Sequence, residues 1–129
     1  MFLKNNYPAL LWAVFIAVLC GMPGKDIPHI SFLELLEFDK WVHASVFFIL
    51  VYLLVRGFTK EDSIPFLKQN PFAVSISFAV AYGGLLEILQ GLIFIDRSAD
   101  VLDFIANSFG ALMVLVYFKV VKRTKQKEA

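Results

Sequence analysis

Four long apolar segments dominate this chain and restrict it to one kind of fold. They cover about residues 7–22, 41–58, 71–95 and 101–121, with polar links between them. Because a helix rises 1.5 Å per residue, about 20 apolar residues cross the ~30 Å hydrocarbon core of a bilayer. A bilayer offers no water to unpaired backbone groups, so segments of this length cross it as helices. The pattern therefore predicts an all-α fold, a four-helix transmembrane bundle.

The composition agrees with a membrane protein of one domain. With 129 residues, the chain is expected to form a single domain over residues 1–129. Its apolar content of 59%, with 16% aromatic residues, exceeds the roughly 45–50% of an ordinary soluble domain. The lipid bilayer is therefore expected to cover part of this surface. The net charge of +1 gives no support for nucleic-acid binding, and the basic tail over 122–129 suits a membrane surface.

The first apolar segment follows an early lysine, as the apolar part of a signal peptide does. It has no A-x-A-like cleavage site, and Leu19 precedes Cys20 where a lipoprotein motif has a small residue. We therefore expect an uncleaved first span. Cys20 is the only cysteine, so no intrachain disulfide can form and no Cys/His metal pattern exists. No cofactor and no metal site are predicted.

The links between the spans predict further structure. Residues 23–40 are too polar to cross a bilayer, and Ser31 and Glu34 within them match a capping box. A short interfacial helix is therefore expected between spans one and two, with its leucine and phenylalanine side chains on the membrane surface. Residues 59–70 are expected to form a polar loop, and residues 96–100 a tight turn that makes spans three and four antiparallel.

The distribution of basic residues predicts the orientation of the bundle. With four spans, 9 of the 12 basic residues fall on the side that carries both termini. These nine are Lys4, Arg56, Lys60, Lys68, Lys119, Lys122, Arg123, Lys125 and Lys127. The remaining three are Lys25, Lys40 and Arg97. By the positive-inside rule both termini are cytoplasmic, and the links over 23–40 and 96–100 face outward.

Polar residues inside the apolar segments gather toward the outward-facing end of the bundle. They are Asp39, Lys40 and His43 at the second span, Glu87 and Gln90 in the third, Arg97 in the turn, and Asp100, Asp103 and Asn107 at the fourth. Within each span they are three or four residues apart, which places each set on one helix face. Glu87, Gln90 and Asn107 lie about 7–12 Å below the membrane boundary at 1.5 Å per residue. These residues therefore predict one polar site at the outer mouth.

Several of these residues also have a structural explanation. Asp39 and Asp100 suit the N-caps of the helices that they precede, and Asp103 suits the positive end of a helix dipole. Lys40 and Arg97 suit interface charges whose side chains snorkel toward the headgroups.

Glu87 is the residue least well explained by structure alone. A carboxylate at this depth costs several kcal/mol unless it is protonated or paired. Arg97, Lys40 and His43 are the candidate partners, although His43 by itself also suits a hydrogen-bonded histidine of the bundle. Ionisable groups inside a membrane span are functional candidates by default.

The same residues form a recognisable pattern. It reads Asp-Lys-x-x-His, then Glu-x-x-Gln, then Arg-x-x-Asp-x-x-Asp-x-x-x-Asn-x-x-Gly, from Asp39 to Gly110. Over about residues 38–117 the chain resembles the VanZ-like family of small bacterial integral membrane proteins. It departs from the family at Val114, where a second small residue is common. The resemblance implies a multi-pass protein of the bacterial inner (cytoplasmic) membrane. The family is named for a protein linked to low-level resistance to teicoplanin, a glycopeptide antibiotic.

The functional prediction is a site that binds an envelope lipid, a cell-wall precursor or a lipophilic glycopeptide such as teicoplanin. Lys40 and Arg97 suit a phosphate or carboxylate headgroup. One alternative is a structural or partner-binding membrane module. Another is a lipid-phosphate enzyme that uses the same residues for acid–base work, although no nucleophile motif or phosphate loop supports it. A transporter would need an oligomer, which the sequence permits.

Overall fold

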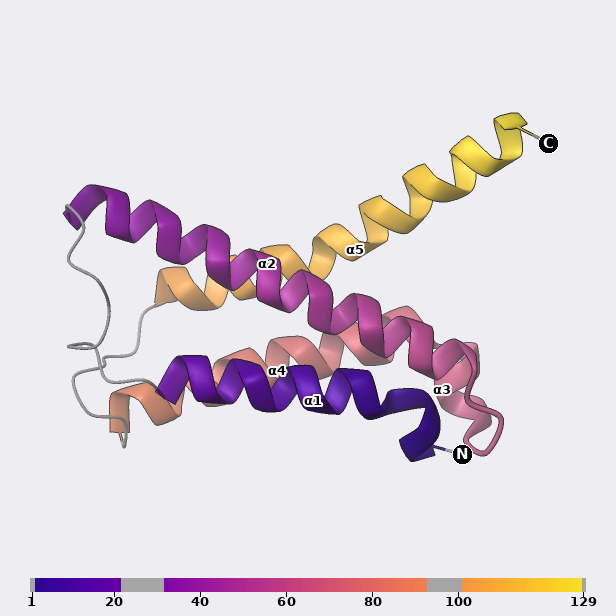
Figure 1. The fold of residues 1–129 in the computed structure, drawn as a ribbon, viewed down its shortest axis with the longest axis horizontal. Coiled ribbons are helices and arrows are strands. Elements are labelled where there is room, and N and C mark those ends of the chain that lie inside the picture. The colour runs from indigo at the N-terminus through magenta and orange to yellow at the C-terminus, as the bar shows by residue number, and fades with distance from the viewer. Residues whose placement is uncertain (1, 22–31, 93–100, 129) are drawn as a thin grey trace.

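Every residue that the structure describes in detail belongs to a helix or to the short connection around one of them. The computed structural model describes residues 2–21, 32–92 and 101–128 (Figure 1). Its helices are α1 (Phe2–Gly21), α2 (Phe32–Thr59), α3 (Pro65–Gln69), α4 (Pro71–Leu92) and α5 (Val101–Glu128). No strand occurs in these three ranges. The prediction of an all-α fold is confirmed.

Four of these helices are long and apolar enough to cross a membrane. Their spanning segments are Phe2–Leu19, Lys40–Thr59, Pro71–Leu92 and Val101–Lys127. Large apolar side chains such as that of Leu92 remain exposed on the outside of the bundle, where lipid covers them. The chain is therefore a multi-pass membrane protein, as the apolar segments predict.

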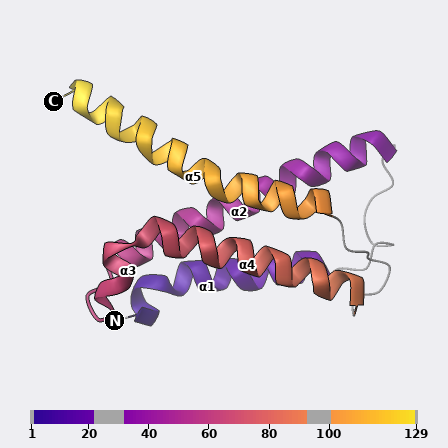
Figure 2. The ribbon, with the colours of Figure 1, turned by 180° about the vertical axis from the view of Figure 1, so that it is seen from behind.

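Helix α2 is the centre of the bundle, since it packs against all four of the other helices. Helices α1 and α4 lie on one side of it, and α5 crosses it at an angle (Figures 1 and 2). The N-terminus lies near α3, whereas the last turns of α5 project away from the other helices (Figure 1). The opposite end of the bundle, where Leu92 ends α4 and Val101 begins α5, is called the far end below.

The core lies along one face of α2, because its buried residues recur every three or four positions. Phe47, Leu50, Val51 and Val55 are each at most 2% exposed, and they pack among residues of α1, α4 and α5. Val114 is also fully buried in this core. The core therefore accommodates valine at position 114, where the family pattern commonly has a smaller residue, and the packing around it stays closed.

The backbones of α2 and α5 approach each other very closely where these two helices cross. Gly110 lies so near the backbone of Ala44 that a Cβ atom at position 110 would overlap the Ala44 carbonyl oxygen. Only glycine permits this approach, because it has no side chain. The crossing fixes the position at which the two helices diverge toward the far end (Figure 2).

The helix predicted between spans one and two is not a separate element. Its residues form the first turns of α2, which continues without a break from Phe32 to Thr59. No proline occurs in this stretch and its glycine comes only near the end, at Gly57, so nothing interrupts the helical hydrogen bonds. The loop predicted over 59–70 contains the short helix α3, which begins at Pro65. The turn predicted over 96–100 lies outside the described residues.

Polar contacts hold α1 to the other helices. The Trp12 indole donates a hydrogen bond to the Val46 carbonyl at 2.8 Å, and the Tyr82 hydroxyl donates one to the Ala13 carbonyl at 2.5 Å. Both are bonds between different helices, which in a membrane are worth about 0.6–2 kcal/mol each. These hydrogen bonds fix the position of α1, the shortest predicted span. A helix with only apolar side chains would lack such directional contacts.

Further polar contacts lie at the end of the bundle near the N-terminus. Asn5 donates hydrogen bonds to the carbonyl of Lys60 and, at 3.5 Å, to the carboxylate of Glu61. The backbone amide of Ser63 also donates to Glu61, whose side chain has no exposed surface. Burial raises the pKa of Glu61, but the hydrogen bonds from Ser63 and Asn5 outweigh it, so the pKa lies below its ordinary value. Glu61 therefore anchors the start of α1 to the loop after α2.

Candidate functional site

An ion pair joins α2 to α5 at the far end of the bundle. The Lys40 ammonium lies 2.5 Å from a carboxylate oxygen of Asp103. The Asp103 side chain is 11% exposed and that of Lys40 is 24% exposed, so most of the pair is buried inside the protein. A charge-assisted hydrogen bond of this kind is shorter and stronger than one between neutral groups. Lys40 reaches this position because it begins the spanning part of α2.

One turn deeper, a second pair of side chains connects the same two helices. Nδ1 of His43 lies 2.8 Å from Oδ1 of Asn107, and both residues are buried. An amide oxygen only accepts hydrogen bonds, so in the tautomer with a proton on Nδ1 the ring donates a hydrogen bond to Asn107. Nε2 of His43 faces a carboxylate oxygen of Asp103 at 3.8 Å. The imidazole thus stands between the amide and the ion pair.

Helix α4 supplies the third wall of the site. Glu87 is 6% exposed and Gln90 is 2% exposed, on the same face of α4 as Gly83. A Cβ atom at Gly83 would lie 3.2 Å from the amide nitrogen of Asn107, so the two helices are in direct contact there. Since α4 and α5 run in opposite directions, one turn toward the far end leads from Gly83 to Glu87 and from Asn107 to Asp103. Glu87 therefore lies at about the level of Asp103.

The residues of this polar cluster share their position for a local reason. His43 follows Lys40 on α2, Gln90 follows Glu87 on α4, and Asn107 follows Asp103 on α5, each by three or four residues. This spacing puts each set on the inward face of its helix. Buried polar groups are costly unless they are hydrogen-bonded, and the Lys40–Asp103 and His43–Asn107 pairs show how neighbouring helices meet that requirement. Below, the polar cluster means Lys40, His43, Glu87, Gln90, Asp103 and Asn107.

Three of the predicted site residues lie outside the side chains that the structure describes. Asp39 lies in α2, but its side chain is outside the described atoms, and Arg97 and Asp100 lie outside the described residues altogether. Their place in the site stays a prediction. Among the residues that the structure does describe, no three His, Cys, Asp or Glu side chains are arranged to hold a metal ion.

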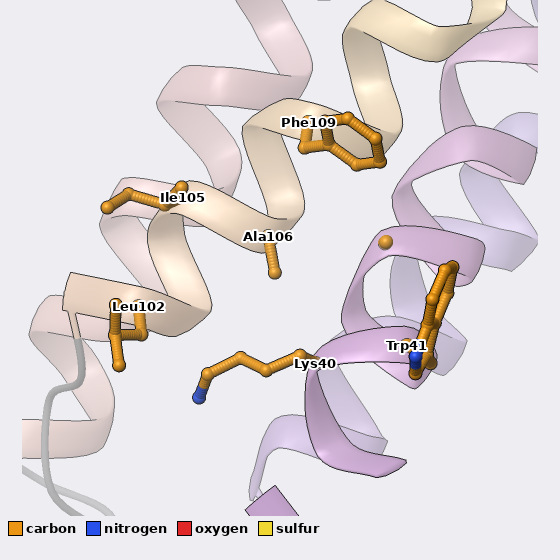
Figure 3. Close-up of a pocket in the computed structure, with 7 residues that line it drawn as sticks. Lys40, Trp41, Leu102, Ile105, Ala106 and Phe109 are labelled. Carbon is orange, nitrogen blue, oxygen red and sulfur yellow. The ribbon is translucent and has the colours of Figure 1, made fainter. Parts of the chain in front are cut away.

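Sequence reasoning missed an apolar groove beside the polar cluster. The groove has a volume of about 420 Å³ and lies between α2 and α5 (Figure 3). Besides the Lys40 side chain, it is lined by Trp41 and Ala44 of α2 and by Leu102, Ile105, Ala106 and Phe109 of α5. Apolar residues occur all along a membrane helix, so those that line a groove cannot be recognised from the sequence. The small residues Ala44 and Ala106, next to the pattern residues, are the signal that points to it.

The polar cluster contains several kinds of chemical group that can contact a polar molecule. It combines a cation, two carboxylates, two amides and an imidazole within the spanning part of the chain. Such a set can accept and donate hydrogen bonds to a polar headgroup, and the imidazole and carboxylates can exchange protons. None of the described residues of the cluster is a serine or cysteine nucleophile.

The fold and the polar cluster together define a four-span helical membrane protein with a buried polar site at one end. The chain belongs to the VanZ/LLP1 family, whose model matches residues 4–122. This match confirms the resemblance that the polar pattern suggests. A role in the cell envelope and in antibiotic resistance is consistent with the family name. No curated protein and no solved structure matches the chain.

Proposed function

We propose that this VanZ-family protein binds the anionic headgroup of an envelope lipid, a cell-wall precursor or a lipophilic glycopeptide such as teicoplanin. The observation that carries the proposal is the polar cluster itself. Three helices bring Lys40, His43, Glu87, Gln90, Asp103 and Asn107 together at one end of the bundle. Ionisable groups inside membrane spans are expensive and mark sites of substrate or ion handling.

The exposure of the cluster supports access from the membrane surface. His43, Glu87 and Asn107 are each at most 7% exposed, whereas the Lys40 side chain is 24% exposed. A headgroup that approaches from the far end therefore meets the ammonium of Lys40 first. Phosphate and carboxylate groups are the usual partners of such a cation. The buried amides and carboxylates behind it would then select among headgroups by their hydrogen bonds.

The distribution of charge supports an outward-facing site. The basic residues at the N-terminal end of the chain, in the loop after α2 and in the last turns of α5 belong to the opposite end of the bundle. By the positive-inside rule that end is cytoplasmic and the far end faces outward. Envelope lipids and cell-wall precursors carry their headgroups at this face in the bacterial inner membrane once they are exported.

The interhelical contacts favour one competing function, a structural or partner-binding module. The Lys40–Asp103 and His43–Asn107 pairs each join α2 to α5 directly. In that case the polar cluster would serve only to lock the bundle. The two functions differ in whether a headgroup binds and in whether its binding depends on these side chains.

The test is the binding of labelled glycerol phosphate, a headgroup without a chain, to purified protein in a mild detergent. We expect Lys40→Gln and Arg97→Ala each to weaken binding by about tenfold, which is the scale of one charge-assisted hydrogen bond. Lys60→Gln is the matched control, because Lys60 is exposed at the opposite end of the bundle. Equal binding by wild type and both site variants would favour the structural module, provided that their unfolding midpoints show all proteins folded.

A further inference from the structure

The apolar groove and the polar cluster share one residue, Lys40. The aliphatic part of its side chain lines the groove, while its ammonium reaches across to α5 (Figure 3). Leu102 lies on α5 near this ammonium, and Phe109 lies at the other end of the groove, toward the helix crossing (Figure 3). A charge thus stands at one end of a groove whose lining surface is apolar. This is the arrangement of a lipid, with a polar head and a hydrocarbon chain.

The dimensions of the groove agree with a single chain. From Leu102 to Phe109 the helix rises about 10 Å, which is the length of the first part of an acyl chain. The volume of about 420 Å³ falls in the range of roughly 300–1,000 Å³ of small-molecule sites. The groove ends where Gly110 meets the backbone of Ala44 and the two helices close on each other. It is therefore closed toward the bundle centre and open toward the membrane.

We propose that the groove between α2 and α5 holds one hydrocarbon chain of an anionic phospholipid whose phosphate lies at Lys40. This inference rests on the proposed function and adds to it the chain site and the class of lipid. The ammonium at the far end of the groove complements a phosphate, and the alanines in its wall leave the space that the chain fills. Trp41 is 70% exposed beside the same opening, at the level where tryptophan anchors helices to the membrane interface.

The selectivity of this site should come from the headgroup and from shape. A chain that moves from bulk lipid into the groove gains no hydrophobic free energy, because its surroundings are equally apolar. An anionic phospholipid should therefore bind more tightly than a zwitterionic one with the same chains. Filling the groove with a side chain should remove that preference, since the phosphate can no longer reach Lys40 with its chain seated.

The experiment is native mass spectrometry of the purified protein with equal amounts of dimyristoyl phosphatidylglycerol and dimyristoyl phosphatidylcholine. Wild type should carry about tenfold more of the anionic lipid. Ala106→Phe, which fills the groove, should reduce this ratio to near one. Ala81→Phe is the matched control, because Ala81 is an exposed alanine on the outer face of α4. It should keep the wild-type ratio.

A second measurement covers the case in which Ala106→Phe does not fold. Phosphatidylglycerol with brominated chains should quench Trp41 fluorescence more than brominated phosphatidylcholine does at the same low fraction. The signal of Trp41 is taken as the difference between wild type and Trp41→Phe. Equal quenching by the two lipids would overturn the inference.

The outcomes separate this inference from the proposed function. If Ala106→Phe loses the lipid preference but still binds glycerol phosphate, the groove holds the chain and the headgroup site is intact. If wild type binds glycerol phosphate but shows no preference between the lipids, the groove inference fails and the proposed function stands. If neither glycerol phosphate nor the anionic lipid binds, both fail. A dimer of the protein that disappears only in Ala106→Phe would show a second copy in the groove and would overturn the inference.

Discussion

The ring nitrogen Nδ1 of His43 and the amide oxygen of Asn107 lie 2.8 Å apart, one turn deeper than the Lys40–Asp103 ion pair. Together these contacts form a short ladder between α2 and α5. The ladder ends at the glycine crossing, where the two backbones touch. Polar pairing and close packing thus fix the same pair of helices at successive levels.

Replacing Glu87 by Gln tests whether the buried carboxylate is kept for structure. The substitution preserves shape and removes the charge at a position that is 6% exposed. We expect an unchanged or higher thermal unfolding midpoint in a mild detergent, because a charge at this depth is costly. A midpoint several degrees lower would indicate that Glu87 holds the bundle together and would support the structural module.

The Lys40–Asp103 pair should show energetic coupling in a double-mutant cycle. Lys40→Gln and Asp103→Asn should each destabilise the protein, because each leaves a partly buried charge without its partner. The double variant should lose less than the sum of the two, with a coupling of about 1–3 kcal/mol. Unfolding by SDS in mixed micelles measures the free energies. Strict additivity would mean that the contact contributes nothing to stability.

Gly110→Ala should destabilise the crossing of α2 and α5. The added methyl group overlaps the Ala44 carbonyl oxygen, and a backbone atom cannot rotate away, so the expected loss is about 1–3 kcal/mol. Gly84→Ala is the control, because its methyl group would meet only the edge of the Phe104 ring at 3.3 Å. That variant should be near neutral in the same SDS titration. Equal losses of stability in the two variants would show that the close contact between Gly110 and Ala44 does not stabilise the protein.

Low pH should weaken the contact by which Glu61 anchors the start of α1 to the loop after α2. Its pKa is lower in the folded protein than the ordinary value of 4.5, so the folded state binds fewer protons than the unfolded one around that pH. The stability from this group is therefore present at neutral pH and is lost as the pH falls through the folded pKa. The unfolding midpoint of wild type should drop as the pH falls below 4.5, and that of Glu61→Gln should drop less.

Asp62→Asn provides the control for this pH dependence. A hydrogen bond from Lys68 lowers the pKa of Asp62, but both side chains are more than half exposed. Exposed pairs contribute little to stability, so this variant should keep nearly the whole acid response of wild type. An acid response that disappears in Asp62→Asn and persists in Glu61→Gln would contradict the assignment.

The orientation can be checked with single cysteines in a Cys20→Ser background. Ser98→Cys lies in the turn predicted to face outward, and Ser63→Cys lies in the loop predicted to be cytoplasmic. A thiol reagent that cannot cross membranes should label the first in intact cells and the second only after lysis. The reverse pattern would place the polar cluster at the cytoplasmic face and would exclude exported envelope lipids as its ligands.

The apolar segments were sufficient to predict the four spans, because a bilayer imposes length and helical structure on them. The helix starts and ends were less predictable. Helix α2 begins at Phe32 rather than near residue 41, because nothing in its first turns breaks a helix and polarity alone does not. Helix α3 was missed because five residues in a polar loop carry no periodic signal.

For the site, spacing predicts a shared face on each helix but not the partner of each side chain. The sequence leaves Arg97, Lys40 and His43 as candidate partners of Glu87, whereas the structure pairs Lys40 with Asp103. The groove depends on how α2 and α5 diverge from Gly110, which is a property of two helices rather than of either segment. The side chains of Asp39, Arg97 and Asp100 remain predicted members of the site.

Helices α2 and α5 are each 28 residues long, and their backbones touch where Gly110 meets Ala44. They diverge on both sides of that point (Figures 1 and 2). On one side of the crossing the Lys40–Asp103 ion pair joins the two helices, and on the other side the Tyr52 ring stacks on the ring of Phe118. Because α5 is joined to α2 at three levels, it cannot turn about its own axis without breaking contacts at all of them.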